Sequence, residues 1–236
     1  MGHLLGPSPD ACGTIGPIAK APAARLWANQ PRIDNAELCG CLVCYFPEYS
    51  FEIKYDGVRA LAAVEGSGWR LWGRERADYT TRYPELDVLR RLPAGTLVDG
   101  ELVAFDTDGR PDLRRLLCRH GLTDPWRIRQ ARQWCPVRYV LFDLLYHRGR
   151  CLMQEPLVRR REMLADVCEK LDVPEVEFSH AVMGAGTTLY QQILAAGYEG
   201  VMAKHLRSAY RPGKRSATWK KIKPRTRRTY DTDVHC

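Results

Sequence analysis

The stretch FEIKYDGVRALAAVE, residues 51–65, is strand-like in composition, but charged and turn-forming residues interrupt it near its start. Lys54, Asp56, Gly57 and Arg59 fall within six positions. An Asp-Gly pair favours a tight turn over a continuous strand ladder, so the chain is expected to turn directly after Lys54. An ordinary exposed lysine of an edge strand would not need that turn. Lys54 is therefore a candidate functional residue.

A lysine amine is a nucleophile only when it is unprotonated. To be unprotonated near neutral pH, the amine would need a pKa roughly 3 units below its free value of about 10.4. This shift corresponds to stabilising the neutral amine relative to the ammonium ion by about 4 kcal/mol. Nearby cations, burial and a metal-bound anionic substrate can provide it. Candidate cations are Arg59 and, in WKKIK, Lys221 and Lys223, which share one face if that segment is a strand. The alternative is an exposed basic edge strand that lysines protect against aggregation.

Length and composition limit the class of protein. A chain of 236 residues with 45% hydrophobic content can bury the core of one large or two small domains. No apolar run reaches the roughly 20 residues that cross a bilayer, and the N-terminus does not resemble a secretion signal, so a cytoplasmic protein without a membrane partner is expected. Nine cysteines, an odd number, favour reduced thiols. Cys39, Cys41 and Cys44 lack the further ligands of a zinc site and are expected to be ordinary thiols.

The net charge of +8 is concentrated late in the chain. Residues 199–228 contain 11 Lys or Arg and one Glu, a local excess of +10, so the remainder sums to about −2. Such a segment can attract the phosphates of a nucleic acid. The alternative is a solvated tail that keeps the protein soluble.

The remaining patterns predict short strands mixed with helices. Strands are expected at 51–65, 69–73, 96–106, 137–147, 200–206 and 218–223, and helices at 83–92, 156–171 and 187–197. Because strands and helices do not alternate regularly, an α+β fold with antiparallel sheets is favoured. Residues 1–50 are expected to be irregular.

The hexapeptide KYDGVR, residues 54–59, resembles the K-x-D-G-x-R nucleophile motif of ATP-dependent DNA ligases, which belong to the covalent nucleotidyltransferases. Further segments resemble that family's motifs in the same order: Arg74 followed by TTRYPEL, VDGELV with Glu101, VLFDLL with Phe142, EGVMAK with Glu199 and Lys204, and WKKIK with Lys221 and Lys223. These matches span residues 51–223. The TTRYPEL segment is closer to DNA ligases than to capping enzymes, and the sequence is similar to short bacterial and end-joining ligases.

The resemblance implies a nucleotidyltransferase (ATP-grasp-like) domain of antiparallel sheets flanked by helices, without a C-terminal OB-fold. Its implied organisation is an irregular segment at 1–50, an adenylation domain at 51–225 and a short basic or polar tail at 226–236. Only about a dozen residues follow Lys223, too few for a small β-barrel.

The resemblance also implies roles for individual residues. Lys54 would attack the α-phosphate of ATP, and Lys221 and Lys223 would be catalytic contacts to phosphate. The implied nucleotide-binding and nick-binding residues are Glu52, Arg59, Arg74, Glu101, Phe142 and Lys204, with Phe142 stacking on adenine and Glu52 accepting a hydrogen bond from the purine. Glu199 would bind Mg²⁺. Arg159, Arg160 and Arg161 begin a helix in a region that contacts DNA in some ligases.

The function implied by the resemblance is sealing of nicks in double-stranded DNA, in repair or recombination, with ATP and Mg²⁺. The expected partners are nicked duplex DNA and a separate OB-fold, polymerase or end-binding protein, and a bacterial member would be nucleoid-associated. Nick binding is expected to rest mainly on residues 207–228. The alternatives are an RNA ligase that uses the same first step, and a truncated remnant that binds ATP or DNA without turnover.

Overall fold

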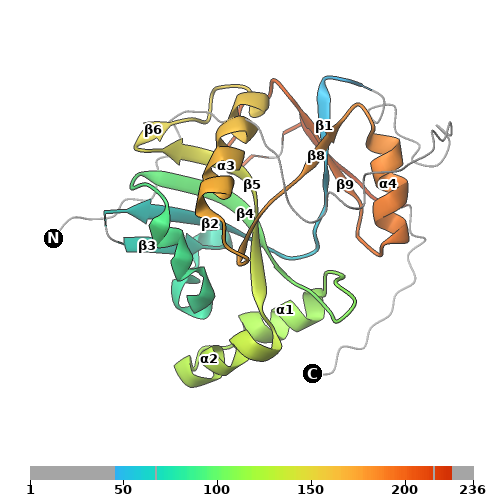
Figure 1. Cartoon of the computed structure of the whole chain (residues 1–236). Helices are drawn as coiled ribbons and strands as arrows, with labels where there is room; N and C mark the ends of the chain where they lie inside the picture. The colour runs from blue at the N-terminus through green and yellow to red at the C-terminus, as the bar shows by residue number, and fades with distance from the viewer. Residues whose placement is uncertain (1–45, 67, 215, 225–236) are drawn as a thin grey trace.

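A computed structural model describes residues 46–66, 68–214 and 216–224, which form two neighbouring sheets with helices packed against them (Figure 1). The strands are β1 (Tyr49–Ile53), β2 (Val58–Glu65), β3 (Gly68–Trp72), β4 (Thr96–Ala104), β5 (Val137–His147), β6 (Arg150–Cys151), β7 (Val176–Phe178), β8 (Ala181–Met183), β9 (Val201–His205) and β10 (Trp219–Ile222). The helices are α1 (Leu113–His120), α2 (Pro125–Trp134), α3 (Leu157–Leu171) and α4 (Gly186–Ala195). Short 3-10 helices lie at Arg74–Arg76, Thr80–Arg82 and Pro84–Arg91.

Both sheets are built from antiparallel pairs. The smaller sheet has the order β10-β9-β1-β8, and the larger has the order β3-β2-β4-β5-β6. Among the described strands, the one parallel pair is β7 with β5. The prediction of an α+β fold with antiparallel sheets is confirmed.

The opening stretch 51–65 is divided between the two sheets. It forms the end of β1 in the smaller sheet and all of β2 in the larger one, with residues 54–57 crossing between them. A side chain at Gly57 would place its Cβ 2.3 Å from the carbonyl oxygen of Leu102, so the close crossing requires glycine. The predicted break in the strand is confirmed, but residues 54–57 form an irregular crossing with a bend at Gly57 and no tight turn, so that prediction is wrong. The crossing leaves Lys54 at the junction of the sheets. The strand itself starts at Tyr49, so the predicted boundary at residue 51 is two residues late.

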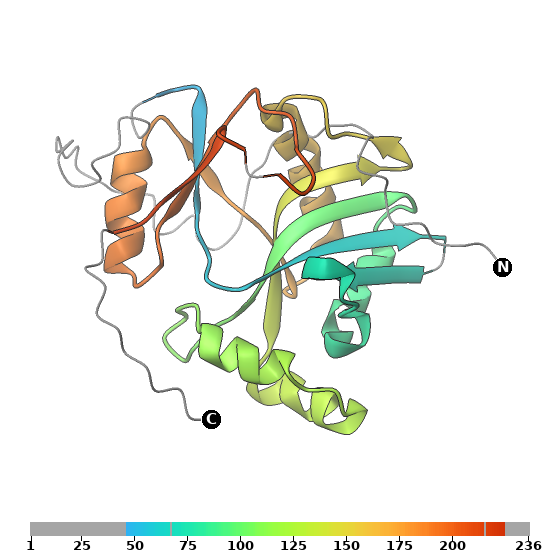
Figure 2. The same ribbon diagram turned by 180° about the vertical axis from the view of Figure 1, so that it is seen from behind.

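Each sheet has one face covered by helices, and the larger sheet also carries a smaller buried cluster on its other face, at Leu97, Leu145, Met153 and Tyr210. In the larger sheet, α3 and the segment Pro84–Arg91 cover the face that carries Ala60, Ala62 and Val64. In the smaller sheet, α4 covers the face that carries Phe51 and Val201. Because side chains alternate along a strand, the remaining residues of β1, β2, β4 and β9 belong to the opposite faces. Figure 2 looks onto the side of β2, β4 and β5 that α3 leaves open.

The sequence predictions located most of the long elements but missed two helices. The segment predicted as a helix at 83–92 is a 3-10 helix over Pro84–Arg91. The helices α1 and α2 were not predicted, although Asp112 and Asp124 give each a capping signal. Their side chains accept hydrogen bonds from the backbone N–H groups of Arg115 and Arg127, at 2.9 and 2.8 Å.

Two compositional predictions concern cysteines and membranes. The cysteines Cys39, Cys41 and Cys44 lie outside the described residues, and Cys135, Cys151 and Cys168 are free thiols. Within the described ranges, no cluster of three or more His, Cys, Asp or Glu could hold a metal ion. No helix in these ranges has both the length and the apolar composition needed to cross a membrane.

Candidate active site

Three strand ends bring Lys54, Glu199 and Lys223 together. Lys54 follows β1, Glu199 lies two residues before β9 and Lys223 follows β10, and β9 pairs with both other strands. The Nζ atoms of Lys54 and Lys223 each form an ion pair with a different oxygen of Glu199. Gly200 permits this approach, because its φ is +151° and a Cβ there would lie 2.1 Å from the carbonyl oxygen of Ile222. The site is thus a carboxylate shared by two ammonium groups.

The two predicted lysines of WKKIK have different surroundings. Lys223 lies beyond the end of β10 and pairs with Glu199, whereas Lys221 lies within the strand and is exposed. None of the ion pairs that the structure describes involves Lys221. Partial burial and the charge of Lys54 lower the pKa of Lys223. The structure therefore brings one of the two predicted phosphate contacts to Lys54.

Lys204 of β9 is buried and is held by Glu52 of β1. Its Nζ lies 2.8 Å from Glu52 Oε2, which also accepts a hydrogen bond of 2.9 Å from Ser179 Oγ. Arg161 of α3 lies 2.6 Å from the other Glu52 oxygen. Burial, the largest cause, lowers the pKa of Lys204. The contact of Glu52 Oε2 with Lys204 gives Glu52 a role in positioning that lysine. Glu52 Oε1 has an ion pair with Arg161 but accepts no hydrogen bond among the described residues, and its direct contact with a purine stays a prediction.

Phe142 lies between the two sheets with cations around its ring. The Nζ of Lys204 is 4.5 Å from the ring centroid, and the Cζ of Arg59 is 5.5 Å from it. The ring of Trp219 meets Phe142 edge to face, with centroids 6.3 Å apart. An aromatic ring beside buried and partly buried cations suits a planar base that carries phosphates.

Arg59 is fixed by a carboxylate that the sequence analysis did not single out. Asp99, which is fully buried, binds the guanidinium of Arg59 through both oxygens at 3.0 and 2.6 Å. Asp99 also accepts a hydrogen bond of 2.7 Å from the Tyr210 hydroxyl, and it is the main cause that raises the pKa of Arg59. Strand alternation was the available signal, since Asp99 lies two residues before Glu101 in VDGELV and shares its face.

Glu101 pairs with Arg59 in the register of β2 and β4. Burial raises its pKa to about 7, helped by Asp99 and opposed by the charges of Lys54, Arg59 and Arg74. Glu101 therefore shares the electrostatic environment of Lys54. Arg74 is exposed, in the 3-10 helix Arg74–Arg76.

The raised pKa of Glu101 predicts a pH dependence of stability. The folded state binds the proton of Glu101 more tightly than the unfolded state, so its contribution to the free energy of unfolding decreases as pH rises from about 4.5 to about 7. Glu101→Gln removes this titrating group, so the variant should not lose this contribution as pH rises. The change in the free energy of unfolding caused by the substitution should therefore be about 1–3 kcal/mol more favourable at pH 8 than at pH 4.5. Urea denaturation at both pH values measures this difference, with the exposed Glu65→Gln as control. The same gain at both pH values would contradict it.

Two arginines predicted near DNA are buried instead. Arg160 binds Asp143 through two hydrogen bonds of 3.0 and 2.9 Å, and both side chains are 0% exposed. Arg161 is 2% exposed and binds Glu52. Of the three, Arg159 is the exposed one, at 62%. The prediction of a DNA contact is therefore wrong for Arg160 and Arg161.

Glu199 fits the predicted role in binding Mg²⁺. This ion keeps several waters and takes one or two carboxylates together with the phosphates of a substrate, so it does not need a cluster of protein ligands. The Glu199 carboxylate lies between two lysines and is 22% exposed, so it can be reached from solvent. The magnesium itself stays a prediction.

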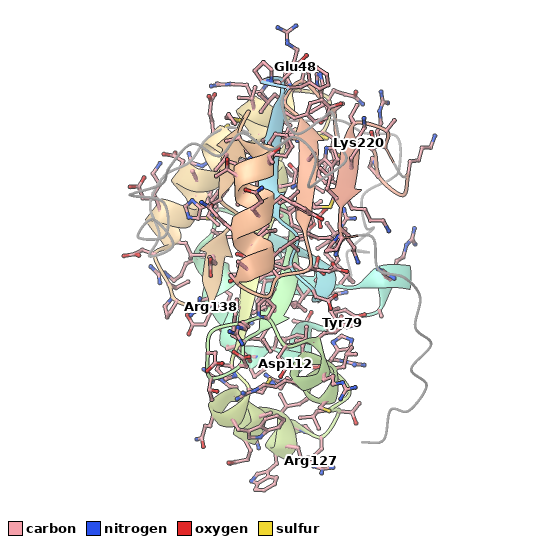
Figure 3. The ribbon with its side chains drawn as sticks, turned by 90° about the vertical axis from the view of Figure 1, so that its right-hand side faces the viewer. Glu48, Tyr79, Asp112, Arg127, Arg138 and Lys220 are labelled. Carbon is pink, nitrogen blue, oxygen red and sulfur yellow. The ribbon has the colours of Figure 1, made fainter. Side chains whose placement is uncertain are left out.

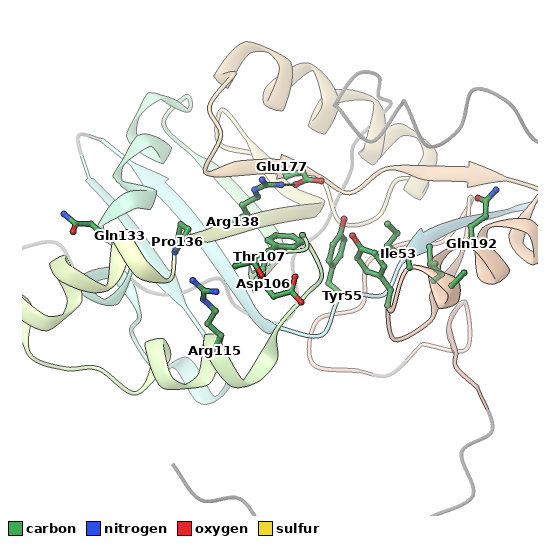
Figure 4. Close-up of a pocket in the computed structure, with 16 residues that line it drawn as sticks. Ile53, Tyr55, Asp106, Thr107, Arg115, Gln133, Pro136, Arg138, Glu177 and Gln192 are labelled. Carbon is green, nitrogen blue, oxygen red and sulfur yellow. Dashed lines mark hydrogen bonds and ion pairs between the residues drawn. The ribbon is translucent and has the colours of Figure 1, made fainter.

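A further pocket is lined by residues that are next to Lys54 in the chain (Figure 4). Its volume is about 920 Å³, and its walls include Ile53 and Tyr55, which flank Lys54, and Tyr198, which precedes Glu199. The rings of Tyr55 and Tyr198 meet edge to face at 5.9 Å, and burial raises the pKa of Tyr55. Residues that are adjacent in the chain to Lys54 and Glu199 thus line the pocket.

Comparison with known proteins shows to which family the chain with this lysine site belongs. The sequence model of the family described as the ATP dependent DNA ligase domain matches residues 44–223. The chain belongs to this family. That range contains every predicted site residue of this ligase domain, from Glu52 to Lys223, and starts before the predicted domain boundary at residue 51.

Individual relatives agree with the assignment. A DNA ligase of Methanothrix thermoacetophila is 35% identical over 181 residues, covering 73% of this chain and 32% of the relative. The multifunctional non-homologous end joining protein LigD of Pseudomonas aeruginosa is 34% identical over 188 residues, covering 78% of this chain and 21% of the relative. The crystal structure of the ligase domain from M. tuberculosis LigD matches with a TM-score of 0.62 and 30% identity, over 74% of this chain and 54% of that one.

These comparisons confirm the predicted family and fold class. The chain has the sequence and the fold of an ATP dependent DNA ligase domain. It spans about a third or less of the length of the curated relatives described above. The resemblance to end-joining ligases is in line with the similarity to LigD.

Proposed function

We propose that this ligase domain transfers AMP from ATP to Lys54 and uses it to seal nicks in duplex DNA. In the first step Lys54 Nζ, after losing a proton, forms a bond to the α-phosphorus of ATP, and the bond to the pyrophosphate oxygen breaks. In the second step an oxygen of the DNA 5′-phosphate attacks the same phosphorus, and the phosphorus–nitrogen bond breaks. In the third step the 3′-hydroxyl attacks the 5′-phosphorus, which forms the phosphodiester and releases AMP.

The observation that carries this proposal is the convergence of Lys54 and Lys223 on Glu199. The Glu199 carboxylate is placed to accept the proton that Lys54 must lose, and Lys223 adds a positive charge beside the reacting phosphate. Glu199 would also hold Mg²⁺, and the ion would supply positive charge to the phosphates of the nucleotide.

The other residues of the site bind and orient the nucleotide in this proposal. Phe142 offers a ring face to adenine, and Lys204 approaches the phosphates from its buried position. Arg59, which is held by Asp99, and Glu101 line the path between the nucleotide and the nick. Arg74 and Lys221 are exposed and so can contact DNA, while Glu52 acts by holding Lys204.

The proposed substrate and location follow from the family. We propose nicked double-stranded DNA as the substrate in repair or recombination, in the cytoplasm beside the nucleoid if the source is bacterial. We also propose partners that contribute an OB-fold, a polymerase or end binding, on the same or another chain. The link to end joining is supported by a relative named as a multifunctional non-homologous end joining protein.

Transfer of label from ATP tests the first step. The full chain is incubated with Mg²⁺ and with ATP labelled at either the α- or the γ-phosphate, and is then denatured. Label from the α position should remain on the protein, and label from the γ position should leave with pyrophosphate. A folded protein that gains no α-label would overturn the proposal and support a remnant without turnover.

Comparison of two nicks tests the substrate. The α-labelled protein is given a DNA duplex with one nick or an RNA duplex with one nick, each with a 5′-phosphate. Faster loss of label to nicked DNA is expected. A clear preference for nicked RNA would make the chain an RNA ligase domain instead.

A further inference from the structure

The helices α1 and α2 form an arm that is rich in arginine and separate from the lysine site. They are inserted between β4 and β5 and lie at one end of the larger sheet, against which α1 packs through Leu116 (Figures 1 and 3). Residues 110–132, which include most of this arm, contain seven arginines and two aspartates. From the sequence, the positive charge was placed in one late segment, and this conclusion is wrong. The arginines of residues 110–132 form a second basic group, which acidic residues elsewhere offset in the net charge of the chain outside residues 199–228.

The charges of the arm face solvent without compensating partners. Four of its arginines are exposed, and within the described ranges none of them takes part in an ion pair: Arg114, Arg127, Arg129 and Arg132. Its two aspartates, Asp112 and Asp124, are occupied as helix caps. The arm thus presents almost pure positive charge.

Large aromatic side chains accompany these charges. Trp126 is 62% exposed and Trp134 is 48% exposed, although burial would stabilise both. Trp126 and Arg129 lie three residues apart on α2, on the side opposite the buried Ile128 and Ala131. Exposed aromatic and arginine side chains on one helix face are suited to a partner that offers both charge and apolar surface.

The arm is held rigidly by the segment TTRYPEL. Arg119 of α1 is fully buried and binds both oxygens of Glu85, at 2.8 and 2.9 Å. The hydroxyl of Tyr83 lies 2.7 Å from His120 Nδ1, and Arg82 donates a hydrogen bond of 2.7 Å to the carbonyl oxygen of His120. These contacts fix α1, and the Arg115 guanidinium of α1 donates a hydrogen bond to the carbonyl oxygen of Trp134, which ties α2 to α1. The exposed arginines of both helices therefore keep a defined place relative to the larger sheet.

We propose that this arm, α1 and α2, binds the sugar–phosphate backbone of duplex DNA at a distance from the nick. Guanidinium groups bind phosphates in a bidentate manner, and an excess of arginine over acidic residues complements a polyanion. The 10 residues of α2 extend over about 15 Å, the length of roughly four base pairs. The inference rests on the proposed DNA substrate. It assigns DNA contacts beyond the basic segment 207–228.

The test removes three charges from the arm. The full chain carrying Arg127→Gln, Arg129→Gln and Arg132→Gln is compared with a matched control, Arg91→Gln, Arg148→Gln and Lys170→Gln. The control residues line a small cleft elsewhere on the protein, so both variants lose the same net charge. Binding to a fluorescent 30-base-pair nicked duplex is measured by anisotropy between 50 and 200 mM salt.

The arm variant should bind DNA about 10–100-fold more weakly, and the slope of log affinity against log salt should decrease by about 2–3. The control should change affinity less than about 3-fold. Equal losses in both variants, or no loss in the arm variant, would overturn the proposal. So would unchanged DNA binding together with lost binding to a polyglutamate peptide, which would indicate an acidic protein partner.

Labelling with α-labelled ATP separates this proposal from the ligase function. Both variants should label like the wild type, because the substituted residues do not belong to the lysine site. If the wild type gains no label but the arm variant still loses DNA affinity, the arm is supported and the ligase proposal fails. If the wild type gains label and the arm variant binds DNA as tightly as the wild type, the first step of the ligase proposal is supported and the proposal for the arm fails.

Discussion

Lys54→Arg is expected to abolish covalent labelling by α-labelled ATP, with a rate at least about 10⁴-fold below that of the wild type. Arginine keeps the positive charge that pairs with Glu199, so the ion pair at the junction of the sheets can persist. Its guanidinium does not lose a proton in proteins, so it offers no free amine to attack phosphorus. The substitution thus separates the charge of Lys54 from its nucleophilicity.

A matched control is available on β10 of the same sheet, which β9 separates from β1. Lys220 of β10 is exposed, and its Nζ lies 5.8 Å from the ring centroid of Tyr49. Lys220→Arg should label at the wild-type rate, and circular dichroism should show that both variants are folded. Labelling of Lys54→Arg at more than about one tenth of the wild-type rate would show that another residue accepts AMP.

The local break in the strand was readable from the sequence, and this is why Lys54 could be located. The pair Asp56-Gly57 predicts a break in the strand, and the structure places the crossing between the two sheets there. Pairing between distant strands was not readable. The contact of Lys54 with Glu199 depends on β9 pairing with β1, which lies about 150 residues earlier, and spacing alone does not specify it. The family motifs supplied that information.

Strand alternation and helix periodicity also have limits that particular residues show. Alternation predicted a common face for Lys221 and Lys223, but β10 ends at Ile222, so the rule does not extend to Lys223. The helix α2 buries only Ile128 and Ala131 and exposes Trp126, so its apolar pattern does not follow one clear stripe. Capping signals were more informative than periodicity for this helix.

Burial of charged residues was the other unreadable feature. The run Arg159, Arg160, Arg161 appears uniformly basic in the sequence, yet the structure exposes the first and buries the other two. The buried arginines require partners on other elements, Asp143 on β5 and Glu52 on β1. A single sequence does not show such pairs, because each partner is also plausible as a surface residue.

The buried pair of Asp143 and Arg160 should be the most sensitive point for stability among the pairs described above. Asp143→Ala is expected to lower the free energy of unfolding by about 3–5 kcal/mol, because it leaves the fully buried Arg160 without a compensating charge. Urea denaturation at neutral pH measures the loss. Glu155→Ala, which removes an exposed pair with Arg150, should cost less than about 1 kcal/mol. A loss below about 1 kcal/mol for Asp143→Ala would show that water or another group compensates Arg160.

The double variant Asp143→Leu with Arg160→Met should recover most of that stability, because apolar side chains of similar size avoid an uncompensated charge. Labelling by ATP should remain several-fold slower than in the wild type. Arg160 also donates a hydrogen bond of 2.8 Å to the carbonyl oxygen of Ser208, whose hydroxyl accepts a hydrogen bond of 3.1 Å from Trp219 Nε1. Trp219 in turn lies against Lys204, with the lysine Nζ 4.4 Å from its ring centroid. Recovery of stability without recovery of labelling would show that the pair positions Trp219 and Lys204, whereas recovery of both would limit its role to folding.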